Sequence, residues 1–328
     1  MTCECHIEIE VLVLTYNRVH LIGSTLESLL AQKRPASRIC VLDNGSTDGT
    51  DKIVRSFEAR GIELVRRQTN DARACWSDLI QMARGQWTML FHDDDLLHPS
   101  YLLHVGAAIA EDPITTVAVS SMKAHTHPEQ IKWPKVHAGH RLTLTARQLA
   151  TRLYGGFPMP FCSAVYRTDV LKSVSLQFDI YGKICDRPFV IDTAKKGRAI
   201  MMLDSYVKYR VHAQQDSMNQ STGPFLAETF ALQRYYRETL GERLINPSGR
   251  IFLRRNYRNL MGEYTRLTQR QVIPHNPKSF LRQAIEAGAA STWSLNIGRC
   301  YAALTKLPRA IERSFKILCK NLTKPGRR

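Results

Sequence analysis

The feature that most constrains the fold is a regular alternation of apolar and amphipathic stretches over the first 120 residues. The apolar stretches, such as "IEVLVLTY", are short and rich in β-branched residues, which is typical of buried strands. The stretches between them, such as "HLIGSTLESLLAQ", carry apolar residues at helical spacing. The pattern predicts strands at residues 9–16, 38–44, 62–67, 86–93 and 115–122. It predicts helices at residues 20–32, 49–61, 72–85 and 99–112.

This alternation predicts an α/β fold with a doubly wound, mostly parallel sheet. Ligands of such sheets sit beyond the carboxyl ends of the strands. Polar residues follow three of the predicted strands at that end. They are Thr15, Tyr16, Asn17 and Arg18 after the first strand, Asp43 and Asn44 after the second, and Asp93, Asp94 and Asp95 after the fourth. We expect these side chains to face one crevice.

The three consecutive aspartates in "WTMLFHDDDLLHP" are unexpected, because the chain holds 46 basic and 29 acidic residues and has a formal net charge of +17. Adjacent carboxylates repel one another unless a cation lies among them. A cluster of carboxylates at a helix N-terminus before Pro99 would account for Asp95 alone. The run therefore indicates a site rather than a cap.

The turn after the first strand reads "TYNRVH" and matches no glycine-rich phosphate loop. This argues against a dinucleotide-binding enzyme and against a P-loop nucleotidase. A phosphate-bearing ligand at this crevice would need a divalent cation to neutralise its charge. Mg²⁺ and Mn²⁺ prefer oxygen ligands, which the aspartates supply.

The rest of the chain divides into two further regions. Periodicity fades between residues 121 and 160, where "HTHPEQIKWPKVHAGH" is predicted to be an exposed loop rather than a histidine metal site. After about residue 220 the chain becomes helical and basic. We therefore predict a nucleotide-sugar-binding half at 1–120, an acceptor-binding half at 121–222 and a basic helical region at 223–328, with these functional names following from the resemblance described next.

Five segments, in order, resemble the family 2 glycosyltransferases with the GT-A fold. They are "VLVLTYNR", "VLDNGSTDGT", "ARGQWTMLFHDDDLLHP", "KICDRPFVIDTAKKG" and "YRVHAQQDSM". The resemblance covers about residues 9 to 220 and does not extend beyond about 225. Each segment alone is weak, but their order and spacing together are specific.

The resemblance implies a nucleotide-sugar site. Tyr16 and Thr15 would contact the base, Asp43 and Asn44 would close around base and ribose, and Asp93 would lie near the ribose or diphosphate. The full set of implied contacts is Thr15, Tyr16, Asn17, Arg18, Asp43, Asn44, Arg73, Asp93 and Arg210.

The resemblance also implies a divalent metal, Mn²⁺ or Mg²⁺. Asp94 would be the main ligand of a DxD-type motif, with Asp95 and His212 as further ligands. Asp95 could instead orient the sugar or hold the local turn, and a lone histidine such as His212 is often structural. The family often has an aspartate where this chain has His92, so the motif reads either 92–94 or 93–95.

By the same resemblance, Asp186 in "ICDRPF" would be the catalytic base. A carboxylate on the far face of the sugar accepts the proton of the attacking hydroxyl, which implies inversion at the anomeric carbon. The alternative for Asp186 is a helix cap ahead of Pro188, and Asp179 is the fallback base.

The end of the chain carries a separate signal in "LTKLPRAIERSFKILCKNLTK". Apolar and basic residues follow helical spacing on opposite faces, which predicts an amphipathic helix on an anionic membrane surface. The alternative is a helix packed on the preceding domain. The sequence shows no signal peptide and no apolar run of membrane-spanning length, and its eight scattered cysteines suit reduced thiols. These features predict a cytoplasmic location on the inner face of the cytoplasmic membrane.

Together these features predict a metal-dependent inverting glycosyltransferase of hexosyltransferase type. It would move a sugar from a nucleotide-sugar, most simply a UDP-sugar, to a glycan or lipid-linked acceptor in cell-surface polysaccharide synthesis, such as lipopolysaccharide. The alternatives are a dTDP-rhamnose-dependent rhamnosyltransferase and a non-catalytic nucleotide-sugar-binding subunit. Nucleic acid is not an expected partner, because the chain shows no zinc-finger or RNA-binding signature.

Overall fold

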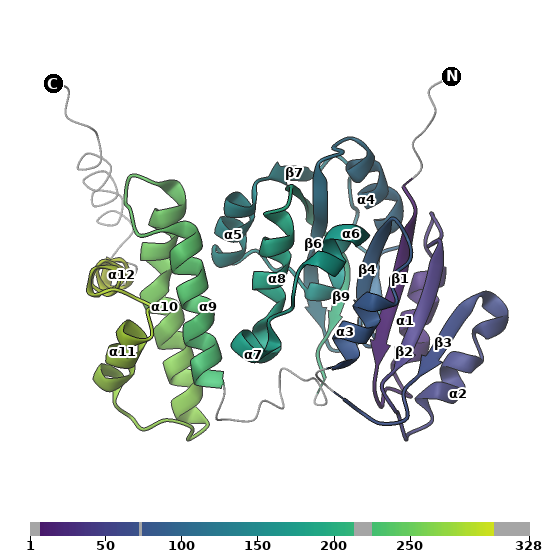
Figure 1. The fold of residues 1–328 in the computed structure, drawn as a ribbon, viewed down its shortest axis with the longest axis horizontal. Coiled ribbons are helices and arrows are strands. Elements are labelled where there is room, and N and C mark those ends of the chain that lie inside the picture. The colour runs from purple at the N-terminus through teal and green to yellow at the C-terminus, as the bar shows by residue number, and fades with distance from the viewer. Residues whose placement is uncertain (1–6, 72–73, 213–224, 305–328) are drawn as a thin grey trace. The chain divides into compact units, whose positions relative to one another are not determined.

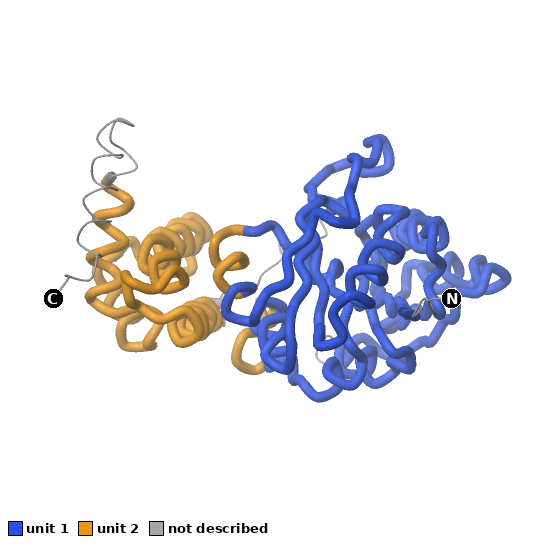
Figure 2. The backbone as a smooth tube through the Cα atoms, turned by 90° about the horizontal axis from the view of Figure 1, so that it is seen from above, with its two compact units in different colours: residues 1–149, 157–178, 186–219 blue, residues 150–156, 179–185, 220–328 orange. Residues whose placement is uncertain are grey.

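The structure is a computed structural model that describes residues 7–71, 74–212 and 225–304 (Figure 1). The chain forms two compact units (Figure 2). The first unit comprises residues 1–149, 157–178 and 186–219, and the second comprises residues 150–156, 179–185 and 220–328. The predicted boundary between residues 222 and 223 lies outside the described residues. Nothing in the sequence pattern indicates that the two short internal segments, 150–156 and 179–185, belong with the C-terminal unit.

Four parallel strands form one half of the sheet in the first unit, in the order β3-β2-β1-β4. They are β1 (Ile9–Thr15), β2 (Arg38–Asp43), β3 (Ile62–Arg66) and β4 (Trp87–His92). The helices between and after them are α1 (Ile22–Leu30), α2 (Thr50–Arg55), α3 (Ala74–Gln81) and α4 (Tyr101–Ala110), and a short 3-10 helix, η1 (Glu58–Arg60), precedes β3. The predicted alternation is confirmed.

The central strands are buried on both faces, as expected where helices cover both sides of a parallel sheet. Val11, Leu12 and Val13 of β1 are fully buried. The apolar stripe of α1 packs into the same core through Ile22 and Leu26. The register aligns the strand ends, because Thr15 pairs with Asp43 and Leu14 pairs with His92. The polar residues that follow these strands therefore emerge along one edge of the sheet.

The other half of the sheet is mixed. It contains β5 (Leu96–Leu97), β6 (Thr115–His125), β7 (Arg141–Leu144), β8 (Val165–Arg167) and β9 (Arg198–Arg210). The long strands β6 and β9 pair in parallel, whereas β8 lies antiparallel between β4 and β6, and β5 and β7 lie antiparallel against β9. The predicted fold class, a largely parallel α/β sheet followed by C-terminal helices, is confirmed.

The region at 121–160 is more regular than predicted. Strand β6 continues to His125, and the 3-10 helix η2 (Pro128–Gln130), strand β7 and helix α5 (Ala146–Tyr154) follow it. These elements are short and partly exposed, so their side chains lack the strong apolar periodicity that marks buried elements. The prediction of an irregular loop holds only for the stretch between η2 and β7.

The remaining elements between α5 and β9 are short helices that precede or follow β8 in the chain. They are η3 (Phe161–Ser163), α6 (Thr168–Ser173), α7 (Phe178–Tyr181), η4 (Gly182–Ile184) and α8 (Asp186–Ala194). Strand β9 follows α8 and pairs with β6 through register shifts near Ser121. Because β9 is 13 residues long, its end carries Arg210 well past the point where the shorter strands stop.

The second unit is helical in its described part, with α9 (Phe225–Leu240), α10 (Pro247–Gln269), α11 (Pro277–Glu286) and α12 (Thr292–Leu304). Side chains such as Leu260 and Phe280 form its core. Asn246 and Asn276 cap α10 and α11 by accepting backbone N–H groups, and a proline starts each helix. None of the described helices has the length and apolar character needed to cross a membrane. The amphipathic tail helix, predicted at residues 304–324, lies outside the described residues except for Leu304.

Candidate active site

The turns after β1 and β4 meet at Asp93. The backbone N–H of Tyr16 donates to Asp93 Oδ2 at 3.1 Å, and Arg18 Nε lies 3.6 Å from Asp93 Oδ1. The Tyr16 side chain is 37% exposed, whereas Thr15 is buried. Two of the predicted polar groups therefore converge, and the Tyr16 ring is left available to a ligand.

The turns after β1 and β2 are joined through Asn17 and Arg18. The N–H of Asn17 donates to Ser46 Oγ at 2.9 Å, and Asn17 Oδ1 accepts the N–H of Thr47 at 2.8 Å. Asn17 adopts a φ of 52°, a left-handed conformation that asparagine tolerates better than most residues. The N–H of Arg18 donates to Thr50 Oγ1 at 2.7 Å. In these contacts Asn17 shapes the turn.

Asp43 and Asn44 are buried at the end of β2. Asp43 Oδ1 accepts from the N–H and hydroxyl of Ser46, and its Oδ2 lies 3.3 Å from Arg66 Nε. Asn44 bonds to Asn70 and to the N–H of Asp71. These contacts hold the β2 turn against the segment that leads into α3. Arg73, predicted to contact the base, lies outside the described residues.

We use the name aspartate turn for residues 92–95, which begin at the last residue of β4. Arg210, at the end of β9, braces this turn. Its backbone N–H donates to Asp95 Oδ1 at 2.9 Å, and its Nε donates to the Asp94 carbonyl at 2.7 Å. Its two terminal nitrogens reach Glu129 and Ser24 Oγ. Arg210 is 5% exposed. The structure thus shows it positioning the turn, while its predicted contact with a diphosphate stays a prediction.

His212 lies beside Asp94, as the sequence prediction requires of two ligands of one ion. The distance from His212 Nε2 to Asp94 Oδ2 is 2.9 Å, and both side chains are largely buried. The two come from positions 118 residues apart in the chain. An imidazole and a carboxylate at this distance can both reach one divalent ion.

Burial and the charge of Asp94 disfavour ionisation of Asp93 and Asp95. Burial and the neighbouring Asp94 charge raise the pKa of Asp93 to about 7, and Arg18 opposes the rise. Burial and Asp94 also raise the pKa of Asp95 to about 8, although hydrogen bonds from Cys162 and Arg210 oppose it. Such shifts mean that the turn takes up protons when it lacks sufficient positive charge. A bound cation would meet this requirement.

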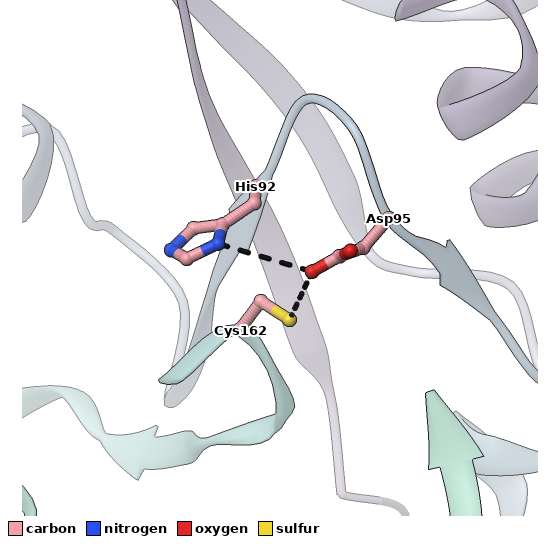
Figure 3. Close-up of side chains that lie close together, drawn as sticks. All are labelled: His92, Asp95 and Cys162. Carbon is pink, nitrogen blue, oxygen red and sulfur yellow. Dashed lines mark hydrogen bonds and ion pairs between the residues drawn. The ribbon is translucent and has the colours of Figure 1, made fainter. Parts of the chain in front are cut away.

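A second group of potential metal ligands consists of His92, Asp95 and Cys162 (Figure 3). Asp95 Oδ2 accepts from Cys162 Sγ at 3.0 Å and lies 3.8 Å from His92 Nδ1. Burial and the adjacent carboxylates raise the pKa of the Cys162 thiol well above its usual value. Because a cysteine binds metal as the thiolate, this group fits a hydrogen-bonded anchor better than an ion site. Protein groups donate hydrogen bonds to both carboxylate oxygens of Asp95. The Asp94 carboxylate instead contacts His212, which is itself a potential metal ligand.

Asp186 is the first residue of α8. Burial raises the pKa of its carboxyl, and the nearby charges of Arg187 and His92 oppose the rise. His92 therefore links Asp186 to the aspartate turn. A carboxylate with a raised pKa is a better proton acceptor than an ordinary surface aspartate. The fallback base, Asp179, lies in α7 and belongs to the second unit.

Several residues of this site were not predicted. Ser24, Glu129 and Cys162 all contact the aspartate turn or its brace, Arg210. Thr25 Oγ1 additionally donates to the Asp93 and Asp95 carbonyls, each at 3.0 Å. Ser24 and Thr25 lie in α1, Glu129 lies in η2 and Cys162 lies in η3, and no local signal distinguishes them. Only the tertiary pairing reveals their place.

Comparison with solved structures supports the fold. A structure of S. aureus TarS residues 1–349 in complex with UDP superposes with a TM-score of 0.57 at 17% identity, covering 90% of this chain and 92% of that chain. The complex of the same protein with UDP-GlcNAc gives a TM-score of 0.58 at the same identity and coverage. At this identity the likeness establishes the fold.

Two curated relatives match part of the chain. An uncharacterized glycosyltransferase of Mycoplasma pneumoniae, the MG060 homolog, is 26% identical over 137 residues, which cover 37% of this chain and 46% of that protein. The succinoglycan biosynthesis protein ExoO of Rhizobium meliloti is 25% identical over 139 residues, or 39% of this chain and 40% of that protein. The chain thus spans less than half the length of each.

The family described as Glycosyl transferase family 2 matches residues 10–175, which make up half of the chain. The matched segment includes the turns after β1 and β2 and the whole aspartate turn. The chain therefore belongs to glycosyl transferase family 2.

Proposed function

We propose that this protein is a metal-dependent, inverting glycosyltransferase that uses a UDP-sugar as donor. The observation that carries the proposal is the approach of His212 to Asp94, at 2.9 Å, within a turn whose other two aspartates are buried. The charge of His92 in the same turn also acts on Asp186. Carboxylates on the donor side and a carboxylate of raised pKa nearby are the two parts that such a transfer needs. Family membership supports the same reaction class.

The donor site is proposed at the ends of β1, β2 and β4. The exposed Tyr16 ring offers a stacking surface for the base, and Asp43, Asn44 and Asp93 surround the proposed ribose position. The two TarS complexes with UDP and UDP-GlcNAc support the choice of a uridine nucleotide. A dTDP-sugar donor remains the alternative, since these side chains do not distinguish uracil from thymine.

We assign the metal to Asp94 and His212. The raised pKa values of Asp93 and Asp95 support a need for positive charge at this turn. Mn²⁺ or Mg²⁺ bound there would act as a Lewis acid on the diphosphate oxygens of the leaving group. The Asp95 carboxylate accepts hydrogen bonds from Arg210 and Cys162. These bonds fix the backbone of the turn and so help to position the neighbouring Asp94.

Asp186 would accept the proton of the acceptor hydroxyl as that hydroxyl attacks the anomeric carbon. Positioned acid–base groups of this kind contribute roughly 10²–10⁴-fold to rate. Attack from the face opposite the leaving diphosphate inverts the anomeric configuration. The base and the aspartate turn come from distant parts of the chain, and the charge of His92 in that turn acts on the base.

The proposed acceptor is a glycan or a lipid-linked glycan in cell-surface polysaccharide synthesis. The succinoglycan biosynthesis protein among the relatives supports a polysaccharide product. A lipid-linked acceptor would place the protein at the inner face of the cytoplasmic membrane. The second candidate, a non-catalytic nucleotide-sugar-binding subunit, would need the same donor site but no base.

The experiment is thermal unfolding with UDP, dTDP, GDP and CMP, each with and without Mn²⁺. A ligand at 100 times its dissociation constant stabilises a protein by about 2.7 kcal/mol, which gives a measurable shift. We expect a shift with UDP that requires both Mn²⁺ and Asp94, so that Asp94→Ala abolishes it. No shift with any nucleotide would refute the transferase proposal, and a shift with dTDP alone would move the donor to the alternative.

A further inference from the structure

Helix α10 presents a row of arginines on its exposed face. Arg250, Arg254 and Arg258 are four residues apart and all exposed, so they lie along one side of the helix over about 12 Å. The opposite side of α10 packs into the core of the second unit. Its buried residues include Phe252, Leu253, Asn256, Leu260, Tyr264 and Leu267.

These arginines have no acidic partner. In the described part of the chain no ion pair joins Arg250, Arg254 or Arg258 to a carboxylate, whereas Arg266 on the same helix pairs with Glu263. The neighbouring Arg255 shows the consequence. Burial lowers its pKa, the charges of Arg258 and Arg254 lower it further, and its Nε is buried without a hydrogen bond. Like charges are thus gathered here at a cost to the isolated protein.

The start of α10 adds an exposed apolar side chain to this row. Ile245 is 70% exposed, more than any other large apolar side chain in the described part of the chain. Arg250 donates to the Leu244 carbonyl at 3.1 Å, which places the segment around Ile245 against the arginine row. Arg243, in the same segment, is also exposed. We use the name α10 arginine face for Arg243, Ile245, Arg250, Arg254 and Arg258.

We propose that the α10 arginine face docks the second unit on an anionic membrane surface. The row lies along the outside of a helix, which suits a broad, flat partner. The charge complements anionic lipid headgroups, and basic residues near such a surface each add to binding. Ile245 would enter the boundary between headgroups and acyl chains, as apolar residues of surface-bound helices do. This inference deepens the proposed membrane location and rests on it.

Phosphate groups of a soluble polyanion would offer the same charge. The exposed isoleucine favours the membrane as partner. Transfer of an apolar side chain from water into a lipid boundary lowers the free energy, whereas contact with a hydrated polymer leaves it in water. The proposal is separate from the predicted tail helix at 304–324, since every residue that carries it lies between 243 and 258.

The test is co-sedimentation of the full chain with vesicles of phosphatidylcholine alone or mixed with phosphatidylglycerol. We expect binding only to the mixed vesicles. Each arginine near an anionic surface contributes about fivefold, so a variant combining Arg250→Ala, Arg254→Ala and Arg258→Ala should bind on the order of 100-fold more weakly. Ile245→Ser should weaken binding to the mixed vesicles and leave binding to inorganic polyphosphate unchanged.

The matched control combines Arg270→Ala, Lys278→Ala and Arg282→Ala, which removes the same charge from exposed positions of the second unit. Equal losses in the two triple variants, or wild-type binding by the α10 variant, would overturn the proposal. Binding to polyphosphate without binding to vesicles would also overturn it. The UDP-dependent thermal shift should be the same in the α10 variant and the wild type. That readout reports folding and donor binding, so failure of the membrane surface is distinguishable from failure of the proposed transferase function.

Discussion

The aspartate turn and the α10 arginine face both gather like charges, but they resolve the repulsion differently. In the turn, each carboxylate has a protein group as its partner. Arg18 lies beside Asp93 and His212 beside Asp94, and Cys162 and Arg210 donate hydrogen bonds to Asp95. On the α10 arginine face, no carboxylate of the described residues forms an ion pair with the guanidinium groups. The first region is organised for a ligand that enters a built site, and the second is organised for a partner that supplies the charge itself.

The largest effect should come from Asp186→Asn. If Asp186 is the base beside the turn, this change should lower turnover by roughly 10²–10⁴-fold. The UDP- and Mn²⁺-dependent thermal shift should persist, because the donor side of the site is untouched. Transfer measured from a UDP-sugar panel to a polysaccharide acceptor provides the readout. Unchanged turnover would assign the base elsewhere, with Asp179→Asn as the next variant to measure.

The second prediction tests the brace of the aspartate turn. Arg210→Met removes a buried guanidinium that bonds to the Asp94 carbonyl, Glu129 and Ser24. Breaking a buried ion pair costs about 3–5 kcal/mol, and we expect the lower end because Glu129 is 43% exposed. Urea unfolding would measure this cost. Thermal unfolding with UDP and Mn²⁺ should also show that the Mn²⁺-dependent shift is lost.

Arg141→Met is the matched control for Arg210→Met. Arg141 also pairs with a glutamate, Glu111, but that partner is 66% exposed. Exposed pairs contribute about 0–1 kcal/mol, so this variant should remain close to the wild type. A similar loss in both variants would show that Arg210 is not a special support of the site.

The third prediction concerns pH. The pKa of Asp95 in the folded protein is about 8, above its unfolded value near 4. The folded state therefore holds a proton that the unfolded state releases, so the contribution of Asp95 to stability is greatest below about pH 4 and is lost as pH rises toward 8. We expect urea midpoints in EDTA to fall between pH 5 and 8, and Asp95→Asn to remove much of that fall. Added Mn²⁺ should flatten the profile. A metal-free profile that rises over this range would contradict the prediction.

The positions of the strand ends could be predicted because hydrophobic periodicity is a local property. The alternation alone placed Tyr16, Asp43 and Asp93 at one edge of the sheet. The separate tasks of the three aspartates could not be predicted, because identical side chains in succession carry no sign of which partner each will meet. Those partners depend on the register shift in β9 and on β8, a strand of three residues inserted antiparallel between β4 and β6. Both features arise from tertiary pairing.

The role of Arg210 shows the same limit in one residue. The sequence pattern placed it near the site, in "YRVH", and the resemblance suggested contact with a diphosphate. The structure adds that its guanidinium reaches three protein groups and is almost fully buried. Charge and position along a strand could be predicted. The direction of the side chain depends on Glu129 and Ser24, which lie 81 and 186 residues away in the chain.

The smallest effect should distinguish the two regions most directly. Arg254→Ala and Arg258→Ala, alone or combined, remove exposed charges that have no ion-pair partner among the described residues. Surface substitutions of this kind usually change stability by no more than about 0.5 kcal/mol. Because the charges of Arg254 and Arg258 both act on Arg255, the change should be neutral or slightly stabilising at low salt. Urea unfolding at low and high salt would measure it, since salt screens the repulsion. A loss comparable to that of Arg210→Met would mean that the arginine face supports the fold, and its charge would no longer indicate an external partner.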